Sequence, residues 1–460
     1  MILINPYSEF ERWFTYPYLG TAYLASALEE IGEEVEIIDC QYMPDFREYL
    51  LNALPRHEMV GISINVSNVS SGLEIAGLIR STHPEKKIIM GGPLATAVPD
   101  QLLPRYSDIV VLGEGEETIV EIVTGTDLSK IKGIAYWDGE VRTNPPRKFI
   151  DNLDRIPYPA WHLVNLDGER SPVRRKMAIM MTSRGCPFKC INCTKLVHGY
   201  RYRERSIPNI MGEIDYLVER FGIEEIHFWD DLFTYKPERV KELCRSIINR
   251  KYKKLRFALP GGIRADINDR EMFKLMREAG FYTVIVAVES GVQRIIDSLG
   301  KRLDLKKVKP TVDTLKELGF RVGAFFMLGT PYDNSETMRK TIDFARKLKV
   351  HHAYFFITIP FPGTKLYDLV KAEGRFLQDM RLCSRAYDEG KAVYEFGQLK
   401  AEDVNRIFKN AYREFYFRPD QIWRTATKLL QDPASLLYML QQGWRLLTRG
   451  VRLGARKKGL

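Results

Sequence analysis

Three closely spaced cysteines, Cys186, Cys190 and Cys193, are the residues of this 460-residue sequence best suited to metal chemistry. They follow the pattern Cys-x-x-x-Cys-x-x-Cys within one short loop. Thiolates are the usual ligands of iron–sulfur clusters, and a four-iron cluster offers four iron corners. Because three thiolates fill three corners, the fourth iron stays open to a small molecule. The spacing therefore predicts a [4Fe-4S] cluster with one exchangeable position.

A structural zinc site and a disulfide are the alternatives at this loop. Zinc prefers four protein ligands, usually from paired Cys-x-x-Cys units. Only His198 is near enough in the sequence to be a fourth ligand, and no second cysteine pair follows. A disulfide would leave one of the three thiols over. The cluster is therefore favoured over both.

The elements around this loop indicate an α/β barrel. Strand and helix patterns alternate between residues 178 and 361, and the cysteine loop directly follows the first strand. Six such units predict an open, partial (β/α)6 barrel with its site at the carboxyl ends of the strands. The expected strands are 178–183, 225–229, 255–259, 283–287, 321–327 and 352–359.

The cysteine spacing and its place after a strand resemble the radical S-adenosylmethionine (SAM) superfamily. In that family the open iron binds the amino and carboxylate groups of SAM and reductively cleaves it to a 5′-deoxyadenosyl radical. Members usually carry an aromatic residue directly before the third cysteine, whereas this sequence has Asn192. That departure weakens the match at the position that contacts adenine, and leaves the cluster ligands unaffected.

The resemblance implies that residues at the strand ends bind SAM. Asp230 and Asp231 stand where members contact the SAM amino group, although Asp231 could instead cap a helix. Arg264 could pair with a carboxylate in bidentate fashion, and Glu289 stands at the position that contacts the ribose. The expected SAM-binding residues are Asp230, Asp231, Arg264, Glu289, Ser290 and Gly329.

Residues 1–125 form a second series of alternating strands and helices. This alternation predicts a doubly wound parallel sheet, which binds ligands at its carboxyl strand ends. Three strand ends run into polar or glycine-rich turns, and together they resemble the cobalamin-binding domain that precedes many radical SAM barrels. The resemblance implies cobalamin contacts at Tyr18, Gly20, Ser63, Asn65, Gly91, Gly92, Pro93, Gly113, Glu114 and Gly115.

The cobalt ligand is where the sequence departs from part of that family. Domains that coordinate cobalt through histidine carry Asp-x-His-x-x-Gly, and the corresponding segment here is Asp39-Cys-Gln-Tyr42. We therefore expect cobalamin to bind without a protein histidine beneath the cobalt. A domain that binds nothing, or another flat cofactor, is the alternative.

The chain thus divides into four expected segments. Residues 1–125 are the cobalamin-type domain, 126–176 a linker with a small hairpin, 177–375 the barrel, and 376–460 a helical C-terminal region. Residues 436–460 hold six basic residues and no acidic one. Four arginines there share one helical face opposite an apolar face, a pattern that suits an anionic membrane surface. The alternative is a helix packed on the barrel with its basic side in water.

Composition narrows the class of protein. The formal net charge is +10 and the hydrophobic fraction is 45%, which is ordinary for a globular protein. No signal peptide and no apolar run of membrane-spanning length is visible, so we expect a cytoplasmic protein, with the tail as a peripheral membrane contact. No RNA-binding module is recognised, so nucleic acid is not an expected partner.

The resemblance implies a cobalamin-dependent radical SAM enzyme. Its commonest form methylates an unactivated carbon, here of a small-molecule or lipid-like substrate, and draws electrons from a donor such as flavodoxin or ferredoxin. One alternative is a radical SAM/cobalamin cyclase or ring-rearranging enzyme without methyl transfer. A tRNA-modifying methylthio-type enzyme is disfavoured, because it usually needs three more cysteines in the N-terminal domain, where only Cys40 occurs.

Overall fold

The N-terminal part of the chain folds around a seven-stranded mixed sheet. The computed structural model describes residues 1–8, 18–43, 45–167, 175–382 and 390–419. The strand order is β2-β1-β3-β4-β5-β6-β7, and the first five of these strands in space run parallel. The strands are β1 (Ile2–Asn5), β2 (Glu36–Asp39), β3 (Met59–Ser63), β4 (Lys87–Gly91), β5 (Ile109–Val111), β6 (Ile134–Trp137) and β7 (Val141–Thr143).

Helices cover both faces of this sheet, as expected for a doubly wound fold. They are α1 (Leu19–Glu29), α2 (Phe46–Ala53), α3 (Val69–Thr82), α4 (Pro93–Ala97) and α5 (Glu116–Val123). Alternate residues of β1 enter different cores: Ile2 and Ile4 pack with α2, α3 and α4, whereas Met1 and Leu3 pack with α1 and α5. A strand buried on both faces reads as a continuous apolar run, which is why β1 was visible in the sequence.

The hairpin of the expected linker belongs to this sheet. β6 pairs antiparallel with β5, and β7 pairs antiparallel with β6. The expectation of a wholly parallel sheet is therefore corrected to a mixed one. The sequence indicated a small hairpin in this segment, but a hairpin signal does not reveal which strand the hairpin pairs with.

A second sheet of six parallel strands forms the barrel, in the order β15-β14-β13-β12-β11-β8. The two outer strands do not pair with each other, so the barrel is open. The strands are β8 (Met177–Met180), β11 (Glu225–Phe228), β12 (Arg256–Arg264), β13 (Phe281–Glu289), β14 (Arg321–Leu328) and β15 (His352–Ile357). The helices are α6 (Ile207–Phe221), α7 (Pro237–Arg250), α8 (Arg270–Glu278), α9 (Gln293–Ser298), α10 (Leu305–Glu317), α11 (Ser335–Leu348), α12 (Lys365–Glu373) and α14 (Ala401–Tyr416).

Two of these strands run further than the sequence indicated. β12 continues past Leu259 through a bulge to Arg264, and β13 continues past Ala287 to Glu289. The proline and glycines at 260–262 looked like a terminating turn. A β-bulge accommodates proline and glycine within a strand, because the regular hydrogen-bond ladder between the strands is interrupted at the bulge.

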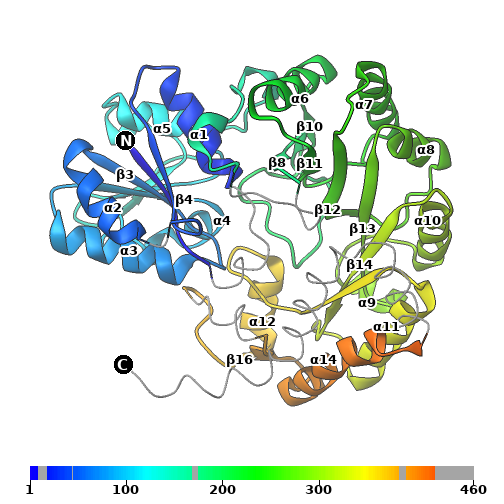
Figure 1. Cartoon of the computed structure of the whole chain (residues 1–460). Coiled ribbons are helices and arrows are strands. Elements are labelled where there is room, and N and C mark those ends of the chain that lie inside the picture. The colour runs from blue at the N-terminus through cyan, green and yellow to red at the C-terminus, as the bar shows by residue number, and fades with distance from the viewer. Residues whose placement is uncertain (9–17, 44, 168–174, 383–389, 420–460) are drawn as a thin grey trace.

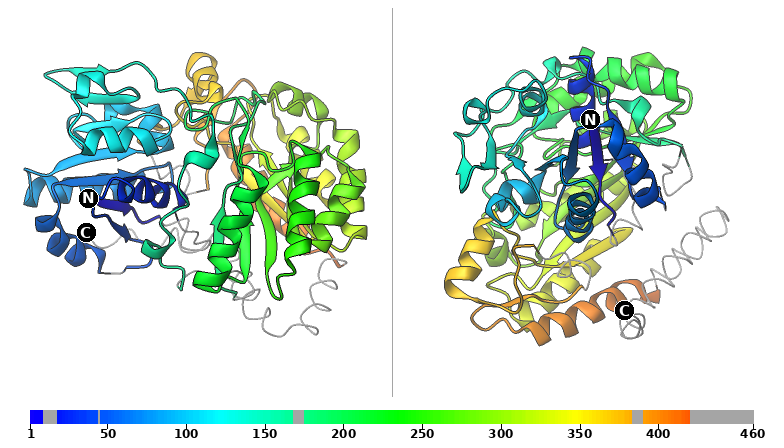
Figure 2. Two further views of the ribbon diagram at one scale, coloured as in Figure 1. Left: turned by 90° about the horizontal axis from the view of Figure 1, so that it is seen from above. Right: turned by 90° about the vertical axis from the view of Figure 1, so that its left-hand side faces the viewer.

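Two short antiparallel ribbons complete the fold. β9 (Ser183–Arg184) pairs with β10 (Arg203–Glu204), and β16 (Arg375–Phe376) pairs with β17 (Tyr394–Glu395). The N-terminal sheet, blue and cyan in Figures 1 and 2, stands beside the green-to-yellow barrel. α14 packs against β15 at one edge of the barrel sheet, and both α12 and α14 are labelled near the bottom of Figure 1.

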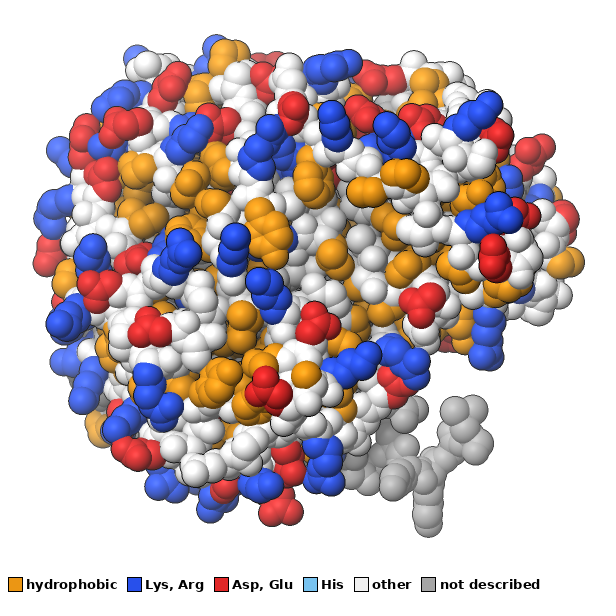
Figure 3. Space-filling view, turned by 180° about the vertical axis from the view of Figure 1, so that it is seen from behind, with side chains coloured by type: hydrophobic (Ala, Val, Ile, Leu, Met, Phe, Trp, Pro, Cys, Tyr) orange, Lys and Arg blue, Asp and Glu red, His pale blue; other side chains and the backbone are white. Residues whose placement is uncertain are grey.

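Charged residues are mixed over the surface. On the face drawn in Figure 3, lysine and arginine side chains alternate with aspartate and glutamate instead of gathering into one basic patch. The basic segment 436–460 lies outside the described residues. No helix in the described part of the chain is both long enough and apolar enough to cross a membrane.

Candidate active site

The three cysteines lie on one loop, residues 185–199, which we call the cluster loop. The β9–β10 ribbon pins its two ends together, with Arg184 opposite Arg203. Gly185 begins the loop with a φ of +84°, and a Cβ there would overlap the carbonyl oxygen of Arg201. Only glycine fits such a position without strain. The tight start of the loop therefore follows from the sequence Arg184-Gly185-Cys186.

The three thiols share one electrostatic environment. Cys186 is buried, Cys190 is half-buried and Cys193 is exposed, and none forms a disulfide. Burial raises the pKa of Cys190, the charges of Cys193 and Cys186 raise it further, and Lys301 opposes both effects. The sulfurs are therefore near enough to feel one another's charge.

Three cysteines on one loop provide the thiol ligands that an iron–sulfur cluster requires. Among the described residues, no three His, Cys, Asp or Glu side chains converge on a point that one metal ion could occupy. His198 faces Asp231, with its Nδ1 2.9 Å from the carboxylate. Thiolates spread around an iron–sulfur core do not need to meet at a single point. The residues present therefore fit the predicted [4Fe-4S] cluster.

Contacts from the barrel hold the cluster loop in place. The Ile191 amide donates to the carbonyl of Leu299 at 2.9 Å, and the Leu366 amide donates to the carbonyl of Ile191 at 2.9 Å. The Asn192 side chain contacts the sulfur of Met327 on β14 at 3.4 Å. The residue that replaces the usual aromatic one thus joins the loop to the barrel.

The structure gives the two adjacent aspartates different roles. Asp230 is buried and accepts hydrogen bonds from the Thr182 amide, the Thr182 hydroxyl and the Ser183 amide at 2.5, 2.5 and 3.2 Å. Burial raises the pKa of Asp230. Its carboxylate thus joins β11 to the end of β8, and a SAM contact at Asp230 stays a prediction.

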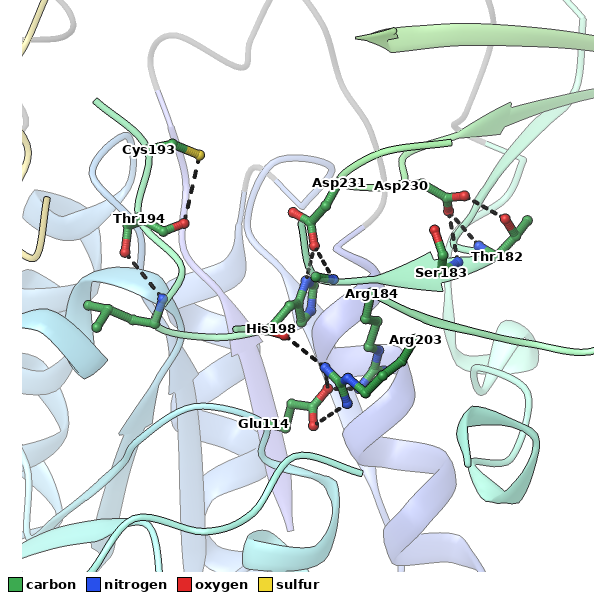
Figure 4. Close-up of polar contacts among 12 residues, drawn as sticks. Glu114, Thr182, Ser183, Arg184, Cys193, Thr194, His198, Arg203, Asp230 and Asp231 are labelled. Atoms are coloured by element: carbon green, nitrogen blue, oxygen red, sulfur yellow. Dashed lines mark hydrogen bonds and ion pairs between the residues drawn. The ribbon is translucent and has the colours of Figure 1, made fainter. Parts of the chain in front are cut away.

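Asp231 points instead toward the cluster loop (Figure 4). It accepts a hydrogen bond from the Gly185 amide at 2.8 Å and lies beside His198. Burial alone would raise its pKa, but the hydrogen bond and charge of His198 lower it to about 2. Asp231 is thus ionised at neutral pH next to the cysteines, where a carboxylate can accept a hydrogen bond from an ammonium group.

Glu289 combines a strained backbone with a salt bridge. Its φ of +71° is one of few such values at non-glycine residues in the described chain, and strain of this kind often marks functional sites. Lys301 Nζ lies 2.7 Å from Glu289 Oε1, with both side chains largely buried. Lys301 is a site residue that the sequence reasoning missed, because no motif distinguishes one lysine of a loop from another.

Lys195 is a second cation that the sequence reasoning missed. Burial alone would lower its pKa, but the charges of Cys193, Cys186 and Asp231 raise it. Lys195, within the cluster loop, and Lys301 therefore both add positive charge near the cysteines.

Arg264, Ser290 and Gly329 bind within the chain. Arg264 pairs in bidentate fashion with Asp266, donates to the carbonyl of Lys301, and lies 4.0 Å over the Phe188 ring of the cluster loop. Ser290 contacts Thr341, and the carbonyl of Gly329 accepts from a tyrosine hydroxyl. These contacts hold the rim in shape, and SAM binding by the three residues stays a prediction.

The predicted cobalamin contacts gather at the carboxyl edge of the N-terminal sheet. Asn65 accepts hydrogen bonds from Ser67 and Asn68, and Ser63 accepts one from Asn68, so this turn supports itself. Gly92 has a φ of +99°, and a Cβ there would lie 2.6 Å from the carbonyl oxygen of Ile64. Its neighbours Gly91 and Pro93 end β4 and begin α4, and Tyr18 and Gly20 lie at the start of α1.

One polar atom at this edge points to a ligand. Asn5 ends β1 next to β3, where a sheet of order 2-1-3-4-5 changes winding direction and binds its ligands. Asn5 is 2% exposed, and its Oδ1 has no hydrogen-bond partner among the described residues. A buried acceptor of this kind needs a donor, and the amide side chains of cobalamin are donors. The edge therefore fits the predicted cofactor.

The turn Gly113-Glu114-Gly115 faces the barrel. Glu114 is buried and accepts from Arg184 at 3.1 Å, Arg203 at 3.0 Å and the Ile150 amide at 2.8 Å (Figure 4). The sequence reasoning placed Glu114 against cobalamin, but its carboxylate is directed at the residues that flank the cluster loop.

Comparisons with known proteins agree with this geometry. Residues 180–345 match the family described as the Radical SAM superfamily, and residues 12–123 match the B12 binding domain. The chain is 32% identical to an uncharacterized methyltransferase of Pyrococcus horikoshii, covering 88% of this chain and 89% of that protein. It is 29% identical to the cytidylyl-2-hydroxyethylphosphonate methyltransferase of Streptomyces wedmorensis, covering 92% and 91%.

A solved structure shares the fold. The radical SAM methyltransferase TsrM from Kitasatospora setae, with cobalamin and a [4Fe-4S] cluster bound, superposes with a TM-score of 0.72. The superposition covers 91% of this chain and 89% of TsrM at 18% sequence identity. The N-terminal sheet and the open barrel therefore form one architecture that is known to fold together.

Proposed function

We infer the function from one premise: the chain belongs to the B12-binding radical SAM enzymes. Its cofactors are a [4Fe-4S] cluster, SAM and cobalamin, and it is a cobalamin-dependent radical SAM methyltransferase. We propose further that it methylates an unactivated carbon of an apolar small-molecule or lipid-like substrate. The substrate is the part of this assignment that the relatives leave open.

The cysteine loop and its cations support the catalytic half of the proposal. When bound, the cluster supplies an electron for reductive cleavage of SAM, and cobalamin supplies the methyl group. Cys186, Cys190 and Cys193 would hold the cluster, while Lys195 and Lys301 offset the thiolate charge. Asp231 and Glu289 are the two carboxylates at the strand ends that we propose orient SAM.

Aromatic side chains inside the barrel support the choice of an apolar substrate. Val322, Ala324 and Phe326 pack outward against the helices. Because side chains alternate along a strand, Phe325 and Met327 face inward. On β15, Phe356 faces inward in the same way, and its ring centroid is 5.6 Å from that of Phe325.

Part of this inner wall is open to solvent. Phe356 on this wall and Trp229, directly after β11, are each 37% exposed. Met327 contacts Asn192 of the cluster loop, so the aromatic wall and the cysteines border the same interior. An apolar substrate held against this wall would cover the exposed rings near the point where SAM is cleaved.

Two partners follow as proposals. The reaction needs a reductant, and we propose flavodoxin or ferredoxin as its source. We also propose that the protein works in the cytoplasm with its basic tail in peripheral contact with a membrane, which would bring a lipid-like substrate within reach.

Labelled SAM tests the reaction type. The anaerobically reconstituted enzyme should transfer label from the SAM methyl group into an organic-soluble product when given apolar extracts of its host. The Phe356→Asp variant should lose this transfer but retain its cluster, because only the substrate wall is changed. Conversion of substrate without incorporation of label would favour a cyclase or ring-rearranging reaction instead.

A further inference from the structure

Four charged side chains are buried where the N-terminal sheet meets the cluster loop. We call them the interdomain ion-pair cluster: Glu114, Glu116, Arg184 and Arg203. Their side chains are 4%, 10%, 6% and 2% exposed, respectively. Glu114 comes from the turn between β5 and α5, Glu116 is the first residue of α5, and the two arginines come from β9 and β10. The N-terminal part thus contributes the two negative charges, and the β9–β10 ribbon contributes the two positive charges.

The contacts within this cluster are multiple and short. Arg184 reaches Glu114 at 3.1 Å and Glu116 at 2.6 Å. Arg203 approaches both oxygens of Glu114, at 3.0 and 2.9 Å. Burial alone would lower the pKa of Arg184, but the charges of its glutamate partners raise it, and Arg184 lowers the pKa of Glu116 against the effect of burial.

These contacts close a ring that passes through the cluster loop (Figure 4). Starting from Glu114, Arg203 donates to the carbonyl of His198 at 2.9 Å. The His198 ring contacts Asp231 at 2.9 Å, and Asp231 accepts from the Gly185 amide at 2.8 Å. Gly185 follows Arg184, which returns to Glu114. The Glu114 carboxylate therefore holds both ends of the cluster loop.

Buried ion pairs are a poor means of simply joining two domains. Their desolvation cost roughly cancels their attraction, so apolar residues would stabilise the interface as well or better. What paired and forked hydrogen bonds provide is fixed direction and distance. Because Arg184 is two residues from Cys186, a shift of Glu114 would move a cluster ligand with it.

We propose that Glu114, Glu116, Arg184 and Arg203 are positioning residues that set the separation and orientation between the corrin-binding edge and the cluster loop. The inference rests on the proposed function, since it requires both cofactors. It gives the Gly113-Glu114-Gly115 turn a role other than cobalamin contact. A productive methyl transfer requires both cofactors to meet in one geometry, and displacements of about 1 Å can cost about 100-fold in rate.

The test uses the full chain, reconstituted with iron, sulfide and hydroxocobalamin, and compares wild type with Glu114→Gln and Glu116→Gln. Magnetic coupling between Co(II) and the reduced cluster, measured by electron paramagnetic resonance, reports their separation. The wild type should give one defined coupling, and the variants a broadened distribution with unchanged iron and cobalamin content. The ratio of S-adenosylhomocysteine to 5′-deoxyadenosine should fall about 10- to 100-fold, because the first product requires both domains and the second only the barrel.

Glu121→Gln is the matched control. Glu121 lies on the same helix α5 and pairs with Arg147 at the surface, with 38% of its side chain exposed. This variant should keep the wild-type coupling and product ratio. Glu116→Gln changes only the contact to Arg184. It therefore tests the positioning role if Glu114→Gln does not fold.

Different outcomes separate the two proposals. A wild-type chain that binds no cobalamin would refute the proposed function itself. If the wild type binds both cofactors and the variants keep its coupling and product ratio, the positioning role is wrong. Equal loss of both products, with the coupling unchanged, would also overturn it, because the residues would then serve folding alone.

Discussion

At the scale of single residues, the three cysteines carry the assignment. Each thiolate would hold one iron, so Cys186→Ala, Cys190→Ala or Cys193→Ala should remove the cluster and abolish SAM cleavage. Iron analysis and the charge-transfer absorbance of the anaerobic protein measure the loss. Cys244→Ala, at a buried cysteine of α7, is the control and should keep its full iron content. Iron content near four per chain in any loop variant would contradict the assignment.

Lys301 is the residue whose role depends most on tertiary contacts. It holds Glu289, the predicted ribose contact, at 2.7 Å. Lys301→Met should leave Glu289 without its partner and weaken SAM binding about tenfold or more, since hydrogen bonds to charged groups contribute about 1.5–3 kcal/mol. Titration of the reconstituted protein with SAM measures the change.

The control for Lys301 is an exposed lysine of the same type of pair. Lys340 forms a salt bridge with Glu336 on α11, where both side chains are in water. Lys340→Met should leave SAM affinity unchanged, because exposed pairs of this kind contribute little. Equal SAM affinity of the Lys301→Met variant and the wild type would argue against Glu289 as a SAM ligand.

At the scale of elements, α14 protects the open edge of the barrel. Tyr412 and Tyr416 lie one turn apart with their rings nearly parallel. The Tyr416 hydroxyl bonds both the amide and the carbonyl of Ala353, and the Tyr412 hydroxyl bonds both groups of Phe355. These two hydroxyls satisfy groups of β15 that a neighbouring strand would otherwise pair, and exposed edges of that kind promote aggregation.

Removing these hydroxyls should therefore destabilise the edge. Tyr412→Phe and Tyr416→Phe each leave a buried amide and carbonyl unpaired, which costs about 1–3 kcal/mol per group. We expect a lower apparent melting temperature and increased light scattering, largest in the double variant. Tyr200→Phe, at a tyrosine with 47% exposure, should behave like the wild type. Unchanged melting and scattering of the double variant would show that packing alone covers the edge.

At the scale of the whole molecule, the N-terminal sheet determines how cobalt is held. Segment 39–42 offers no histidine, and its Gln41 contacts the Ser8 amide. We expect the Co(II) form of the bound cobalamin to show no nitrogen superhyperfine splitting in electron paramagnetic resonance. A three-line nitrogen pattern would mean that a nitrogen lies beneath the cobalt, and labelling the protein with nitrogen-15 would tell a protein nitrogen from the base of the cofactor itself.

The basic C-terminal segment is the second feature at this scale. Deleting residues 436–460, which lie outside the described residues, should release the protein from anionic vesicles but leave its iron and cobalamin in place. Each basic contact near such a surface contributes about 1 kcal/mol and weakens with salt. Co-sedimentation of full-length and truncated protein at low and high salt measures this. Equal sedimentation of both forms, or unfolding of the truncated one, would identify the segment as a structural helix.

Local patterns in the sequence were sufficient for the architecture, and they single out the three cysteines as predicted cluster ligands. Strands buried on both faces appear in the sequence as apolar runs. Three cysteines that are close together in the sequence must also lie close together in space. The two sheets, the open barrel and the three cofactors could therefore be predicted. The place of the hairpin β6–β7 could not, because pairing between distant strands leaves no local signal.

The roles of individual polar residues were decided by the tertiary structure alone. Sequence neighbours Asp230 and Asp231 face different partners, since consecutive side chains after a strand diverge and each finds whatever donors lie there. Glu114 meets Arg184 and Arg203 across long stretches of chain, and Lys301 reaches Glu289 from a separate loop. Charge pairing depends on distances between elements that only packing fixes. The sequence, through its resemblance to a known family, therefore predicted the cofactors, and only the fold showed which polar side chains face one another around the predicted site.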